Sequence, residues 1–286
     1  MKTPGAVDSS NWLAGTHCTS LWQDAADSYG ECMFPSPPPP PAPEAAPSGT
    51  WPLFTFRGIR VFLHWSWILV AVYHINKGQG EYPHIGWDIG EYLVLFGIVL
   101  VHEFGHAFAT RQVGGIAERI LLWPFGGIAF VQTPPRAGAY LWGIAAGPLV
   151  NVVLWPILYF IVSFYGDPFR FYSTGPLGAD GYLETMPLFL HNIFWINTVM
   201  LIFNLIPAYP LDGGQIFRGI LWFFVGPMKS LLIAAWTGLV LGGAAMIFVI
   251  VKWQALWLAV MMGLIVQQSW MAISRVREWN RQMRAR

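Results

Sequence analysis

The fold of this chain is decided by residues 92–106, which read YLVLFGIVLVHEFGH. An apolar run from Tyr92 to Val101 leads directly into a His-Glu-x-x-His motif. A run of this kind is typical of a helix that enters a lipid bilayer. Two histidines and a carboxylate are therefore expected at membrane depth. Ionisable side chains there cost about 2.5–3.5 kcal/mol or more each, and they usually mark functional sites.

The spacing of the motif predicts a metal site. Positions i and i+4 of a helix lie on one face, so His102 and His106 can share one metal ion. Glu103 is not a ligand in this arrangement, and its carboxylate is predicted to act as a general base towards water. The alternative interpretation is structural: the three polar residues are satisfied by neighbouring helices, or the helix simply ends and leaves the membrane.

The composition supports a membrane protein. Of the 286 residues, 55% are hydrophobic and 11% are charged, whereas soluble domains are nearer a quarter charged. The 16 Trp and 20 Phe residues fit aromatic side chains at a lipid interface. The predicted fold is an all-α polytopic membrane protein with about six transmembrane helices, each about 17 to 25 residues long, near residues 61–76, 90–111, 138–164, 187–207, 229–250 and 253–273.

Residues 116–131, IAERILLWPFGGIAFV, interrupt the pattern of long apolar runs. The stretch is apolar but short, with Pro124 and the pair Gly126-Gly127 in its middle. This composition predicts a membrane-associated β-hairpin after the second helix, with two brief strands around a Gly-Gly turn. Apolar strands can dip into the membrane only where protein covers their edges.

The distribution of Lys and Arg predicts that both termini are cytoplasmic. The opposite side of the membrane keeps only Lys77, Arg170 and Lys252. The predicted cytoplasmic side collects Arg57, Arg60, Arg111, Arg119, Arg136, Arg218, Lys229 and the five arginines after residue 273. The formal net charge of +1 gives no reason to expect a nucleic-acid partner.

A catalytic zinc site takes three protein ligands and keeps one position open for water. Asp212 is the preferred third ligand, because it follows an apolar span that ends on the same side as His106. Pro207 and Pro210 break that helix, and Gly213-Gly214 permits a turn that can bring the carboxylate back towards the metal. The alternative for Asp212 is an N-cap of the helix that starts near Gln215.

Two other residues are weaker candidates for the third ligand. His191 lies at the start of a span, on the side of the membrane opposite the motif. Glu118 lies beside Arg119 in the predicted cytoplasmic segment.

Three motifs in this chain, taken in order, resemble those of the site-2 protease family of intramembrane zinc metalloproteases, peptidase family M50. They are the His-Glu-x-x-His motif, the sequence GPLVN at 147–151, and the sequence NLIPAYPLDGG at 204–214. The resemblance covers roughly residues 57 to 225. Two modules found in the family, a PDZ insert and a cystathionine-synthase-type domain after the last span, have no counterpart in this sequence.

The resemblance implies one Zn²⁺ per chain, held by His102, His106 and Asp212, with Glu103 as the base. It implies that Asn204 and Asn151 bind the substrate or the oxyanion. The 116–131 hairpin resembles the membrane-reentrant strands of the family, and Gly126 and Gly127 are its predicted substrate contacts. The substrate class that the resemblance implies is a membrane-anchored regulatory protein, cut in or near its transmembrane segment, in the inner membrane of a bacterial cell.

Three segments follow from these expectations. Residues 1–50 are predicted to be a Pro-rich, disordered cytoplasmic tail, residues 51–273 a six-helix membrane metalloprotease domain, and residues 274–286 a basic cytoplasmic tail. The alternative function is a non-catalytic membrane scaffold or transporter that retains the motif as structure. A membrane di-iron hydroxylase needs several clusters of histidines, whereas the 7 histidines of this chain are mostly scattered.

Overall fold

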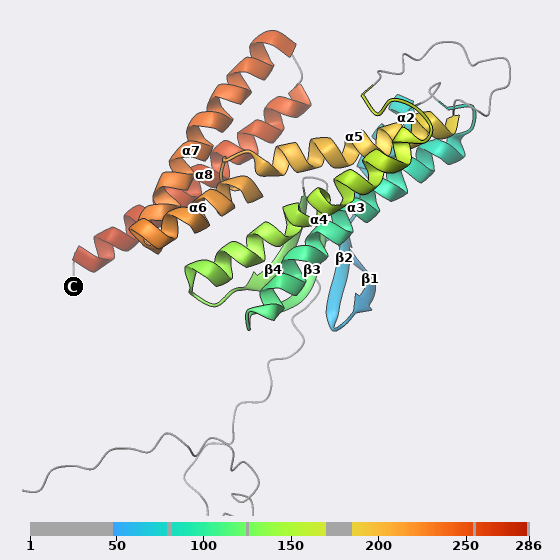
Figure 1. Ribbon diagram of the computed structural model, residues 1–286. Coiled ribbons are helices and arrows are strands. Elements are labelled where there is room, and N and C mark those ends of the chain that lie inside the picture. Colours follow the sequence, from blue (N-terminus) through green and yellow to red (C-terminus); the bar gives the residue numbers. More distant parts are fainter. Residues whose placement is uncertain (1–47, 79–81, 124–125, 170–184, 254–255, 285–286) are drawn as a thin grey trace, which may run out of the picture. The chain divides into compact units, whose positions relative to one another are not determined.

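The computed structural model describes residues 48–78, 82–123, 126–169, 185–253 and 256–284 (Figure 1). The elements, in chain order, are β1 (Thr50–Phe56), β2 (Ile59–His64), α2 (Trp67–Gly78), α3 (Ile85–Gln112), β3 (Ile116–Trp123), β4 (Gly126–Gln132), α4 (Ala137–Ser163), α5 (Thr185–Leu205), α6 (Asp212–Val225), α7 (Pro227–Phe248), a π-helical turn (Val249–Trp253) and α8 (Leu256–Arg284). The protein is therefore mostly helical with a small β-sheet.

Within the described residues, four helices are long and apolar enough to cross a membrane. They are α3, α4, α5 and α7, the last taken together with the π-helical turn as far as Lys252. Helix α2 is shorter: its 12 residues rise only about 18 Å. The expected count of about six spans is thus confirmed for four helices of the described chain, and not for α2 or α8.

The predicted helix at 61–76 is wrong in its first half, because residues 59–64 form strand β2. This strand pairs with β1 on one side and runs parallel to β3 on the other, with Val61 opposite Ile120. The run Ile-Arg-Val-Phe-Leu-His is rich in β-branched and aromatic residues, which favour strands. Helix α2 begins only at Trp67. The side chains of His64 and Ser66 hydrogen-bond each other just before it.

The predicted hairpin at 116–131 is confirmed as the antiparallel pair β3 and β4, and it belongs to a four-stranded sheet in the order β1-β2-β3-β4. The predicted Gly-Gly turn is wrong. Gly126 and Gly127 already lie in β4, opposite Trp123 and Leu122, and residues 124–125 between the strands lie outside the described chain. The sheet ends at β4, so one side of this strand is a sheet edge.

The main apolar core joins the sheet to α3. Buried side chains from β2 and β3, including Val61, Ile120 and Leu122, pack with Val99 and Ala107 of α3. Each buried aliphatic side chain of this kind contributes about 1.5–3 kcal/mol. The core therefore fixes the sheet along the half of α3 that carries the histidine motif.

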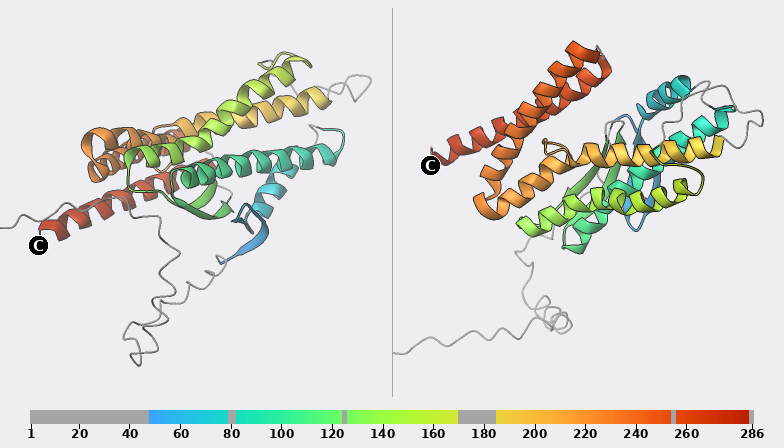
Figure 2. Two further views of the ribbon diagram at one scale, coloured as in Figure 1. Left: turned by 60° about the horizontal axis from the view of Figure 1, so that its bottom comes forward. Right: turned by 45° about the horizontal axis from the view of Figure 1, so that its top comes forward.

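The other helices pack in sequence from α3 outwards. Helix α4 packs along α3 and α5, while α6 contacts both α4 and α7. Helices α7 and α8 lie side by side as a helical hairpin (Figure 2). Gly105 of α3 lies against the backbone carbonyl of Ala146 of α4, where an added methyl group would clash. This close approach brings α4 directly against the histidine motif.

The boundaries of the predicted terminal segments can be compared with the observed elements. Residues 1–47 lie outside the described chain, so most of the predicted tail at 1–50 stays a prediction, although Thr50 already begins β1. The predicted C-terminal tail at 274–286 is helical as far as Arg284, as a continuation of α8.

Candidate metal centre

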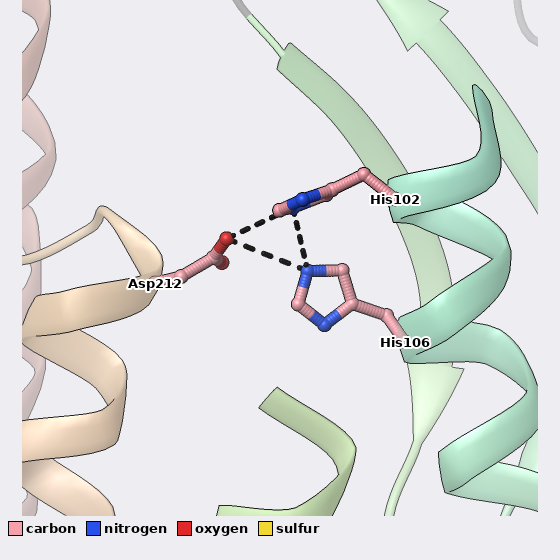
Figure 3. A group of neighbouring side chains, drawn as sticks. All are labelled: His102, His106 and Asp212. Carbon is pink, nitrogen blue, oxygen red and sulfur yellow. Dashed lines mark hydrogen bonds and ion pairs between the residues drawn. The ribbon is translucent and has the colours of Figure 1, made fainter. Parts of the chain in front are cut away.

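Helix α3 presents His102 and His106 to the same point. The two residues are one turn apart, and their ring centroids lie 4.8 Å from each other. Their Nε2 atoms are 3.1 Å apart. His102 is 2% exposed and His106 is 6% exposed, so both imidazoles are removed from solvent. The i, i+4 pair predicted from the sequence thus forms one face of a buried site (Figure 3).

Asp212, the first residue of α6, completes the group. Its Oδ2 atom lies 3.0 Å from Nε2 of His102 and 3.5 Å from Nε2 of His106. The next two residues, Gly213 and Gly214, press against the backbone of the preceding segment, at Leu205 and Ala208, where any Cβ would overlap main-chain atoms. The glycine pair therefore permits the tight turn that swings Asp212 towards α3.

The alternative interpretation of Asp212 as an N-cap is wrong. Leu211 occupies the N-cap position of α6, and no side chain caps this helix end. The carboxylate of Asp212 instead contacts the two histidines.

The donor set fits a zinc ion. Zinc binds nitrogen at about 2.0–2.1 Å and carboxylate oxygen at about 2.0–2.2 Å, so two ligands of a tetrahedral ion lie about 3.3 Å apart. The three separations here, 3.1, 3.0 and 3.5 Å, bracket that distance. In the described chain, these are the His, Cys, Asp and Glu side chains that could hold a metal ion together.

Hydrogen bonding on the far side of His106 supports the same conclusion. Its Nδ1 atom lies 2.9 Å from the carbonyl oxygen of Gly143. A carbonyl oxygen can only accept, so Nδ1 carries the proton and donates it. When the ring is neutral, its lone pair is then on Nε2, the atom that faces Asp212 and that would bind a metal ion.

The charge of Asp212 suits this role. Burial alone would raise the pKa of its carboxyl, but the interaction with His102 and His106 outweighs burial and holds the pKa below its usual value. Asp212 is therefore an ionised ligand at neutral pH.

Gly147 of α4 makes room for the His106 ring. A Cβ atom at this position would overlap Nε2 and two carbons of the imidazole. We expect Gly147→Ala to displace His106 and to remove bound zinc. The closely packed helices α3 and α4 cannot move apart by the width of a methyl group without losing their packing. Zinc content of the purified variant, measured by mass spectrometry, checks this expectation.

The matched control is Gly97→Ala on α3, where an added methyl group meets no atom within 4 Å. That variant should keep zinc. Normal zinc content in the Gly147→Ala variant would contradict the packing that places His106.

Glu103 and Asn204 are the two predicted catalytic residues. Glu103 lies between the histidines in sequence and is buried, at 6% exposed. Asn204 lies in the last turn of α5, eight residues before Asp212, and is half-buried.

Asn151, predicted as a substrate contact, has a different position. It is fully buried on α4, and its Oδ1 lies 2.6 Å from Nδ1 of His102. Its Nδ2 donates to Oδ1 of Asn197 at 2.8 Å. Asn151 therefore contacts His102 and Asn197, and its contact with a substrate stays a prediction.

Asn197 of α5 was not identified from the sequence. It is fully buried, and its Nδ2 donates to the backbone oxygen of Asn151 at 3.1 Å. The available signal was an amide in the middle of an apolar span, a place where polar side chains usually have partners.

The other sequence candidates lie outside the group. Glu118 is exposed on β3, and His191 is buried in α5 without joining the three donors. Gly126 and Gly127 lie in β4 at the edge of the sheet.

Known proteins match this chain in three comparisons. The sequence model described as "Peptidase family M50" matches residues 183–250. A zinc metalloprotease of Methanocaldococcus jannaschii is 36% identical over 183 residues, which are 64% of this chain and 49% of the relative. A solved structure, the site-2 protease from Methanocaldococcus jannaschii, matches with a TM-score of 0.53 at 29% identity, covering 78% of this chain and 95% of that one. The chain spans about half the length of the curated relatives it matches.

Proposed function

Because the chain belongs to the site-2 protease family of zinc metalloproteases, peptidase family M50, we propose that it is an intramembrane endopeptidase. It hydrolyses a peptide bond in or near the transmembrane segment of a membrane-anchored regulatory protein. The observation that carries this proposal is the convergence of His102, His106 and Asp212 within 4.8 Å, beside the buried Glu103.

His102, His106 and Asp212 would hold one zinc ion per chain. Bound zinc supplies Lewis acidity and lets water act as a nucleophile at neutral pH. Glu103 takes the proton of the attacking water and later delivers it to the leaving amine. The position of Glu103, next to His102 in the chain and buried on α3, supports this role.

Asn204 would stabilise the oxyanion. The Nδ2 group of an amide donates a hydrogen bond to oxygen. A donor that is already held in place by a packed helix does not have to reorganise when negative charge develops on that oxygen. The half-buried position of Asn204 in the last turn of α5, eight residues before Asp212, supports this assignment.

The substrate would be held as an added strand. A helix shields its carbonyl groups with internal hydrogen bonds, so a transmembrane helix must unwind before it can be cut. Strand β4 is an edge of the four-stranded sheet, and an edge strand offers main-chain donors and acceptors to an extended peptide. Gly126 and Gly127 begin this strand and, without side chains, would let a peptide backbone approach closely.

The four apolar helices make this chain a membrane protein, and its partners would be the lipid bilayer and the substrate. The surplus of Lys and Arg supports cytoplasmic N- and C-termini. We place the protein in the inner membrane of a bacterial cell.

Metal content and proteolysis of the full chain in lipid nanodiscs test this function together. We expect one zinc ion per chain. We also expect cleavage of a membrane-anchored polypeptide whose span contains Gly and Pro, with cleavage lost after treatment with 1,10-phenanthroline and restored by added zinc. Protein that is folded but holds no zinc would instead favour a non-catalytic scaffold or transporter.

A further inference from the structure

One face of α4 lies against both histidines. Gly143, Gly147 and Asn151 are spaced at i, i+4 and i+8, which places them in one row along a helix. Gly143 binds Nδ1 of His106 through its carbonyl oxygen, and Asn151 binds Nδ1 of His102 through its side chain. The two contacts differ in one respect: a carbonyl oxygen can only accept, whereas an amide can be turned to accept or to donate.

The orientation of the Asn151 amide is decided by Asn197. The Asn197 group that faces the backbone oxygen of Asn151, at 3.1 Å, must be its NH₂, because that oxygen only accepts. The other end of the Asn197 amide is then an oxygen, and it faces Asn151 at 2.8 Å. The NH₂ of Asn151 must therefore point to Asn197, and its Oδ1 must point to His102 at 2.6 Å.

We propose that Asn197 and Asn151 are positioning residues, which fix His102 with its proton on Nδ1 and leave Nε2 free to bind the metal. The chain of hydrogen bonds begins at the backbone oxygen of Asn151 and ends at His102, and both amides are fully buried. Water therefore cannot replace either partner. The effect on zinc binding rests on the proposed function, whereas the position of the proton on His102 follows from the hydrogen bonds alone.

Single variants should weaken zinc binding without removing a ligand. Groups that hydrogen-bond the far nitrogen of a metal-binding histidine typically change metal affinity by roughly 10- to 100-fold when they are removed. We expect a loss of this size in Asn151→Leu, which removes the acceptor, and in Asn197→Leu, which lets the Asn151 amide turn over. Thr198→Val is the matched control, since Thr198 is the next residue on α5 and its hydroxyl donates only to the backbone oxygen of Phe194.

A double variant separates positioning from packing. Both oxygens of a carboxylate accept, so Asn151→Asp loses the hydrogen bond that Asn151 donates to Asn197 but keeps an acceptor for Nδ1 of His102 in either orientation, and it should keep zinc affinity. In the Asn151→Asp background, residue 151 has no amide for Asn197 to orient. Asn197→Leu should then change zinc affinity less than about threefold, although it costs roughly 10- to 100-fold in the native background.

The experiment measures zinc dissociation constants of the full chain by competition with a chromogenic chelator. It also measures the ¹⁵N spectrum of labelled histidine, with and without zinc, and thermal unfolding of each variant. We expect a protonated Nδ1 at His102 in the native chain, and a mixture of Nδ1 and Nε2 protonation in metal-free Asn197→Leu. Equal losses of affinity from Asn197→Leu in both backgrounds would overturn the proposal, as would a protonated Nε2 in the native chain. If the native chain binds no zinc, the proposed function fails, while the ¹⁵N spectrum still decides where the proton lies.

Discussion

Replacement of Glu103 by Gln is expected to abolish proteolysis while one zinc ion per chain stays bound. Gln keeps the size of the side chain but cannot take a proton from water. General base catalysis contributes roughly 10²–10⁴-fold to the rate. The cleavage rate of the variant should therefore be lower than the native rate by at least that factor. Zinc should remain, because the metal is assigned to His102, His106 and Asp212, whose donor atoms lie within 4.8 Å of one another.

The measurement is a single-turnover cleavage rate together with the zinc content of the same sample. Glu91→Gln is a suitable control, because Glu91 is also a buried carboxylate on α3, at 7% exposed. It accepts hydrogen bonds from Tyr82 and Asn192 and belongs to a different polar cluster. That variant should cleave at close to the native rate. Cleavage at the native rate by Glu103→Gln would show that the base has been assigned wrongly.

Replacement of Asp212 by Ala is expected to weaken zinc retention and to remove activity. Asp212 supplies the one donor of the group that does not come from α3, at 3.0 Å from His102 and 3.5 Å from His106. Without it, two imidazoles remain on one side of the ion. The loss of zinc affinity should exceed the roughly 10- to 100-fold effect of removing a group that only supports a ligand.

Zinc absorption spectroscopy and metal content check this result. The native spectrum should contain two nitrogens and an oxygen from the protein, and the protein oxygen should be lost only in Asp212→Ala. Glu118→Ala and His191→Ala serve as controls, since neither residue joins the three donors, and both should keep zinc. An unchanged spectrum in Asp212→Ala would remove Asp212 from the metal centre.

The arrangement also explains why the metal centre depends on distant helices. Ser269 of α8 donates to the backbone oxygen of Tyr209 at 2.7 Å, in the segment that leads to Asp212. Gln215 of α6 donates to the backbone oxygen of Pro210 at 2.9 Å. These contacts hold the segment before α6 in place, so the carboxylate of Asp212 meets the two imidazoles of α3 without further rearrangement.

The sequence by itself determined the parts that depend on local geometry. The i, i+4 spacing of His102 and His106 places both rings on one face of any helix, so their pairing needs no tertiary information. The long apolar runs of α3, α4, α5 and α7 were readable for the same reason, because a span depends on length and composition. The Pro and Gly residues around Asp212 marked a broken helix in advance.

The tertiary structure alone decided the parts that depend on contacts between distant residues. Residues 59–64 form a strand because β3, some sixty residues later, lies alongside to accept their main-chain hydrogen bonds, and strand formation depends on such pairing more than on intrinsic preference. Asn151 lies behind His102, and Asn197 behind Asn151, because α4 packs between α3 and α5. A hydrogen bond between two side chains is fixed by the distance and direction between their helices, and no local pattern in the sequence contains either quantity.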